Sequence, residues 1–139
     1  MKVKKKNEVS TKIGFSAPVF AASPRAGEPK KLIKDNYIDL NSILAPKPQN
    51  VYMVHVQGDS MIDECIYSGD ILIVDRTESP SDGTVVIAAL NGELLVKTYR
   101  VIEGKVYLFS ANQRFLPIEI FPDWQFDVQG VVKHVIHSL

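Results

Sequence analysis

The sequence has one cysteine, few histidines and no long apolar run. Because Cys65 is the single cysteine among 139 residues, a framework of internal disulfides is excluded and a reducing compartment, the cytoplasm, is expected. No segment approaches the roughly 18 consecutive apolar residues that a membrane-spanning helix needs, so a membrane is not an expected partner. The three histidines lack the spacing of metal ligands, and we therefore expect no metal and no cofactor.

The chain also lacks a net charge, because 16 basic residues balance 16 acidic ones. The balance conceals a split: residues 1–34 carry a net charge of +7 and residues 35–139 carry −7. The basic segment shows little periodicity and is interrupted by Gly14, Pro18, Pro24, Gly27 and Pro29. We therefore predict a flexible, extended arm (1–36) and a body (37–139). The arm's charge keeps it solvated, or it contacts the body, nucleic acid or an acidic partner.

The body is predicted to be mainly β, a compact fold of strongly bent sheets. Segments rich in β-branched and aromatic residues alternate with turn signals. They are 52–57, 71–76, 84–90, 93–99, 105–109 and 126–136. Asn91-Gly92 is a typical hairpin turn between two of them. Single helical turns are predicted at 42–44 and 61–63.

Two positions in the body suggest hydrolytic chemistry. Ser60 lies in the tetrad Gly58-Asp59-Ser60-Met61, where Gly58 and Asp59 favour a sharp turn, so that a neighbouring backbone N–H could serve as an oxyanion donor. Lys97 follows the apolar residues 94–96 on a predicted strand. A serine and a neutral lysine can form a hydrolytic dyad that needs no histidine and no metal.

The dyad places a demand on the pKa of Lys97. At a reference pKa of about 10.4, roughly one lysine in 2,500 is neutral at pH 7. Lowering the pKa to about 7 requires on the order of 4.6 kcal/mol of destabilisation of the ammonium, which burial must supply. The apolar strand around Lys97 provides such a setting. Taken separately, however, a lysine on an amphipathic strand is commonly a solvated edge residue, and a Gly-Asp-Ser sequence is commonly an ordinary turn.

The ordered series of motifs is more specific than either residue. It consists of Val56–Met61, Ser68–Asp75, Asp82-Gly83 before an apolar strand, and Glu93–Lys97. From about Tyr37 to the carboxyl terminus, this series resembles the LexA and UmuD family of self-cleaving serine peptidases. Type I signal peptidases share a similar Gly-Asp-Ser-Met and lysine arrangement, so the dyad alone does not distinguish the two groups.

The resemblance carries further expectations. It implies the LexA/UmuD-type peptidase fold, with Ser60 as nucleophile and Lys97 as base. A short arm without room for a helix-turn-helix resembles the UmuD branch, so sequence-specific DNA binding is not expected. In that branch, a RecA filament on single-stranded DNA stimulates self-cleavage in the SOS response. The processed homodimer then joins a Y-family polymerase, UmuC, for error-prone translesion synthesis.

A self-cleaving enzyme needs a substrate bond in its own chain. Ala26-Gly27 is the predicted bond, because both side chains are small and the pair lies in the arm before the body. It resembles the Ala-Gly or Cys-Gly bond cut in the family. Two other functions remain open: a soluble peptidase that cuts other proteins, related to type I signal peptidases, and a nonenzymatic β module whose arm binds a partner.

Overall fold

A computed structural model describes residues 1–8, 16–20 and 32–139 of the chain. The described part is mainly β, as predicted. Its strands are β1 (Lys2–Glu8), β2 (Ser16–Phe20), β3 (Leu32–Asp39), β4 (Val51–Gln57), β5 (Ile71–Asp75), β6 (Val85–Leu90), β7 (Glu93–Ile102), β8 (Lys105–Phe109), β9 (Ile118–Glu119) and β10 (Phe126–Ile136). Its helical turns are α1 (Leu40–Leu44), η1 (Pro48–Asn50) and η2 (Ile62–Glu64).

The six predicted strands of the body are confirmed as β4, β5, β6, β7, β8 and β10, with ends that shift by up to three residues. In β4 the side chains alternate between the two faces of the sheet. Val54 and Val56 are buried, whereas Met53 and His55, which precede each of them, are partly exposed. The hairpin at Asn91-Gly92 is also confirmed. Both residues have positive φ, at 48° and 86°, which a tight turn between twisted strands requires.

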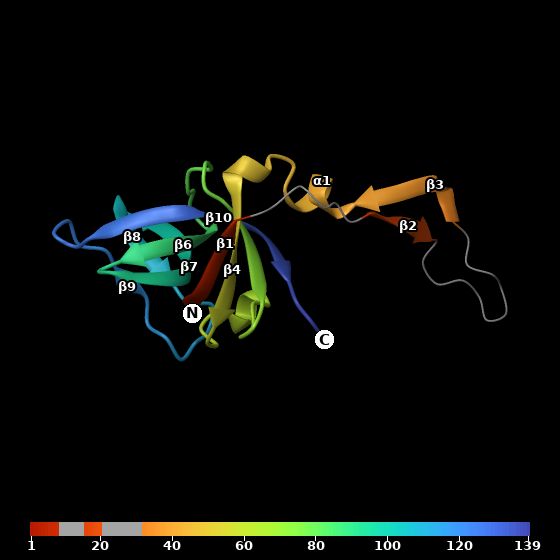
Figure 1. Ribbon diagram of the computed structural model, residues 1–139. Coiled ribbons are helices and arrows are strands. Elements are labelled where there is room, and N and C mark those ends of the chain that lie inside the picture. Colours follow the sequence, from red (N-terminus) through yellow and green to blue (C-terminus); the bar gives the residue numbers. More distant parts are fainter. Residues whose placement is uncertain (9–15, 21–31) are drawn as a thin grey trace.

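Eight strands form one sheet in the order β1-β4-β5-β10-β6-β7-β8-β9. The order closes on itself, because Lys2 of β1 pairs both with Gln57 of β4 and with Leu95 of β7. Strand β1 therefore lies between β4 and β7 (Figure 1). The sequence gives no sign of this pairing, since β1 reads as a run of lysines.

Strand β10 bends as it passes from β6 to β5, as its ladder shifts show. Gly130 lies at this bend, where a Cβ would stand 2.6 Å from Val74 Cγ1 and 2.7 Å from the Asp75 oxygen. Only glycine permits such an approach, and the bend lets one long strand serve both halves of the sheet.

The main core lies inside this curved sheet. Its fully buried members come from β4, β5, β6 and β7 and from the turn after β4: Tyr52, Val54, Val56, Met61, Leu72, Val74, Ile87 and Val96. Met61, directly after Ser60, has no exposed surface. Its burial fixes the turn that carries Ser60 to the core.

The amino-terminal part of the chain contains a second, two-stranded sheet. Strands β2 and β3 pair antiparallel, and Figure 1 shows this hairpin extending away from the main sheet. The predicted helical turn at 42–44 lies within α1, where Asp39 Oδ1 accepts a hydrogen bond from Asn41 N at 3.0 Å. The predicted cleavage bond Ala26-Gly27 lies outside the described residues.

Candidate active site

Ser60 is a buried residue in the turn directly beyond the end of β4. Gly58 opens the turn with a φ of 111°, and its N–H donates to Ser68 Oγ at 3.3 Å. Ser60 itself is 2% exposed, whereas Asp59 before it points to solvent. The predicted sharp turn of Gly58, Asp59, Ser60 and Met61 is therefore present.

Lys97 reaches the same point from β7. Its Nζ lies 3.3 Å from Ser60 Oγ, although 37 residues separate them in sequence. Lys97 is 6% exposed, and burial lowers the pKa of its amine below the ordinary value. The fold thus brings together the two residues that the sequence singled out, in a setting that favours the neutral lysine.

The Lys97 amine has a second hydroxyl neighbour, which the sequence analysis missed. Ser110 Oγ lies 2.6 Å from Nζ, closer than Ser60 Oγ. The ring of Phe115 lies 5.4 Å from the same nitrogen. Ser110 directly follows β8, and the only sequence signal for it is a change from apolar to polar residues at the end of that strand.

The segment after β8 also braces the turn of Ser60. Asn112, which is 7% exposed, donates from Nδ2 to the Asp59 carbonyl oxygen at 2.9 Å. Asp63 N donates to the Ala111 carbonyl oxygen at 2.8 Å. The first bond fixes the peptide group between Asp59 and Ser60, and the second ties the segment after Ser60 to the chain beyond β8. No spacing in the sequence predicts either bond.

The amino terminus of β1 occupies the remaining side of the site. The Met1 α-amine is hydrogen-bonded to Ser60 Oγ, and the Met1 carbonyl oxygen accepts from Val96 N at 2.7 Å. Burial, followed by the nearby charge of Lys97, lowers the pKa of this α-amine to about 5. Met1 therefore lies directly against the Ser60 hydroxyl.

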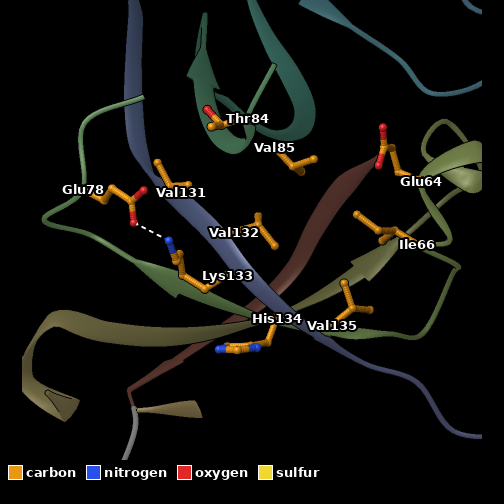
Figure 2. Close-up of a pocket in the computed structure, with 10 residues that line it drawn as sticks. All are labelled: Glu64, Ile66, Glu78, Thr84, Val85, Val131, Val132, Lys133, His134 and Val135. Carbon is orange, nitrogen blue, oxygen red and sulfur yellow. Dashed lines mark hydrogen bonds and ion pairs between the residues drawn. The ribbon is translucent and has the colours of Figure 1, made fainter. Parts of the chain in front are cut away.

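A shallow hollow remains open next to this contact. It has a volume of about 250 Å³ and is lined by Met1, Lys2, Gln57, Gly58, Asp59, Ser60 and Phe115. A separate pocket of about 300 Å³ runs along β10 and is shown in Figure 2. None of the residues around Ser60 lines it, and its Lys133 and Glu78 pair with each other at 2.7 Å. The open hollow beside Ser60 is therefore the one relevant to hydrolysis.

Metal chemistry finds no support among the described residues. Within the ranges 1–8, 16–20 and 32–139, no group of three or more histidine, cysteine, aspartate or glutamate side chains is placed to hold an ion. In the same ranges, no helix is long and apolar enough to cross a membrane. The candidate site therefore consists of hydroxyl, amine and backbone groups.

Comparison with known proteins gives a family match over most of the chain. The model of the S24-like peptidases matches residues 18–133. A LexA repressor of Stenotrophomonas maltophilia is 36% identical over 98 residues, which cover 70% of this chain and 46% of that protein. A LexA repressor of Xylella fastidiosa strain M23 is 34% identical over 109 residues, which cover 76% and 51%. The chain spans about half the length of the curated relatives it matches.

Proposed function

The chain belongs to the S24-like peptidase family, and from that premise we propose that it is a serine peptidase of the DNA-damage response that cleaves its own chain. The observation that carries the proposal is the buried pair of Lys97 Nζ and Ser60 Oγ, 3.3 Å apart. A neutral amine at this distance can accept the serine proton.

The proposed reaction proceeds in two steps. Ser60 Oγ attacks the carbonyl carbon of Ala26 while Lys97 Nζ takes the hydroxyl proton. The Ala26-Gly27 bond then breaks, and Lys97 returns the proton to the leaving amine of Gly27. Water hydrolyses the resulting ester on Ser60, with Lys97 again as base. The turn fixed by Asn112 offers backbone N–H groups for the oxyanion, as in other acyl-transfer sites.

We expect self-cleavage to accelerate as the pH rises, and this experiment tests the proposal. Only the neutral form of Lys97 is a base, and burial lowers its pKa, so the rate should rise at pH values below the ordinary lysine pKa of about 10.4. The purified chain should be incubated across the pH range and the products quantified by gel electrophoresis. A rate that is flat from about pH 7 to 10 would exclude a lysine base.

We further expect the new amino terminus to be Gly27, which mass spectrometry of the product can establish. Cleavage there releases residues 1–26, which carry six basic residues and one acidic residue, and leaves a product of net charge −5. Ala26→Trp should be cut much more slowly, because a bulky side chain does not fit a cleft shaped for alanine. A different terminus, or undiminished cutting of Ala26→Trp, contradicts the assignment.

At a finer level, we propose the role of the UmuD branch: a cytoplasmic protein whose processed homodimer is a subunit of a Y-family translesion polymerase. A RecA filament on single-stranded DNA would stimulate cleavage by a population shift. The occupied site supports this idea, because a filament that binds the form with β1 displaced would favour cleavage. Loss of the basic residues before Gly27 would then change the electrostatic preference for partners.

The relatives named LexA repressor support a second candidate, a DNA-damage repressor. The two roles predict different partners for the purified chain. Binding of the uncleaved chain to promoter DNA of damage-inducible genes would favour the repressor. Co-purification of the processed chain with a Y-family polymerase, together with lesion bypass in primer extension, would favour the accessory subunit.

A further inference from the structure

The register of two strands places Ser110 beside Lys97. Strands β7 and β8 pair antiparallel, with Thr98 opposite Phe109 as the last partners in the ladder. Continuing the same register by one residue puts Ser110 opposite Lys97. Directly opposed residues point to the same face of a sheet with their Cβ atoms about 5 Å apart. The 2.6 Å contact between Nζ and Ser110 Oγ is therefore built into the ladder.

Ser110 is also held from its other side. The hydrogen bonds of Ala111 and Asn112 to the Ser60 turn fix the segment in which Ser110 lies. Ser110 consequently contacts Lys97 through its hydroxyl, and the two residues after it connect its segment to the turn of Ser60. The Met1 α-amine, by contrast, belongs to β1 and would leave the site with that strand.

We propose that Ser110 is a positioning residue, whose hydroxyl holds the Lys97 amine so that its lone pair faces Ser60. A neutral amine has two N–H donors and one acceptor lone pair. With one N–H donated to Ser110 Oγ, rotation about the last side-chain bond is restricted. The lone pair is then left for the Ser60 proton. This inference rests on the proposed function, because an oriented lysine matters only if Lys97 is the base.

The hydroxyl has a second, separable effect on the protonation of Lys97. An acceptor bonded to an ammonium stabilises the charged form more than the neutral form, so Ser110 opposes the effect of burial on the pKa. The titratable group next to Lys97 is the Met1 α-amine, directly before β1; it interacts in turn with the Asp59 carboxylate on the turn and with Lys2. All three are identical in the variants compared below.

The test compares Ser110→Ala with Ser110→Thr, which keeps a hydroxyl, and with Ser81→Ala, which removes a hydroxyl from a loop outside the site. In Ser110→Ala we expect the limiting rate of self-cleavage at high pH to fall on the order of 10- to 100-fold, because the lone pair of the Lys97 amine is no longer held toward Ser60 Oγ. The midpoint of the pH profile should move to lower pH. Ser110→Thr should recover most of the rate, and Ser81→Ala should match the unmodified chain.

A merely structural role would lower the rate without this shift in midpoint. Urea unfolding of each variant shows whether stability has changed. Equal limiting rates in Ser110→Ala and the unmodified chain would overturn the proposal, and so would a slow Ser110→Ala variant that Ser110→Thr does not improve.

A second measurement does not depend on cleavage. NMR titration of the Lys97 side chain in the uncleavable Ser60→Ala background, assigned by comparison with Lys97→Arg, reports the protonation midpoint directly. Adding Ser110→Ala should lower that midpoint, and adding Ser110→Thr should not. If the unmodified chain is never cut, the proposed function fails, whereas this titration still decides whether Ser110 acts on Lys97. Coincident titrations overturn the inference about Ser110.

Discussion

Replacing Ser60 or Lys97 with alanine is expected to abolish self-cleavage, with a loss on the order of 10⁴-fold or more for each. In the proposed mechanism Ser60→Ala removes the attacking oxygen, and Lys97→Ala removes the base, whose Nζ lies 3.3 Å from that oxygen. Lys97→Arg should be equally inactive, because a guanidinium is not neutral at any accessible pH. The measurement is the fraction of chain cut after incubation at alkaline pH.

Two controls separate lost chemistry from lost folding. Lys133→Ala removes a lysine whose partner is Glu78 at 2.7 Å, in the pocket along β10, and should be cut at the unmodified rate. Urea unfolding of the Ser60 and Lys97 variants should show a cooperative transition in each case. A folded variant at either position that is still cut at the normal rate would overturn the dyad.

Much of the body was predictable because its strands carry local signals. In β6 and β7 the apolar residues occur in runs bounded by Asn91-Gly92, and a hairpin with this turn has one favoured register. The pairing of Val86 with Lys97 follows from that turn alone. The burial of Lys97 could likewise be predicted, because its neighbours on both of these strands are apolar.

The rest depends on contacts between segments that are distant in the sequence. Nothing local in the lysine run of β1 indicates that it pairs with β4 and β7. The pairing arises because β4 and β7 each have an edge with free backbone hydrogen-bonding groups that β1 can fill. Strand β9 has only two residues, too few for a periodic pattern. Ser110 contacts Lys97 because of the register of β8, and Asn112 contacts the Asp59 carbonyl because of where the Ser60 turn lies. A short sequence motif predicts neither the register nor the position of the turn.

The position of β1 has a direct consequence for the reaction. Strand β1 lies between β4, which leads to Ser60, and β7, which carries Lys97. The α-amine of Met1, directly before β1, contacts Ser60 Oγ. A scissile bond cannot occupy the same place at the same time. If the chain cleaves itself at Ser60 as proposed, the first residues of β1 have to leave the site.

Locking β1 in place is accordingly expected to stop self-cleavage. Lys2 and Gln57 are opposed in the β1–β4 ladder and are both exposed, and opposed residues in an antiparallel pair have Cα atoms about 4.5–5.5 Å apart, within the range of a disulfide. The variant Lys2→Cys with Gln57→Cys, in a Cys65→Ser background, should be cut when reduced and resist cutting when oxidised. Adding a reductant to the oxidised protein should restore cleavage. Because the 2–57 cross-link spans the Ala26-Gly27 bond and would hold cut fragments together, each sample is quenched and then fully reduced before gel electrophoresis.

A cross-link elsewhere in the sheet provides the matched control. Val101 and Val106 are opposed in the β7–β8 ladder, away from β1. The variant Val101→Cys with Val106→Cys, in the same Cys65→Ser background, should be cut in both its oxidised and its reduced form. If the oxidised Lys2→Cys, Gln57→Cys protein is cut as fast as this control, β1 does not compete with the substrate segment, and its place beside Ser60 does not limit cleavage. If only the β1 cross-link blocks the reaction, release of this strand is a required step of self-cleavage.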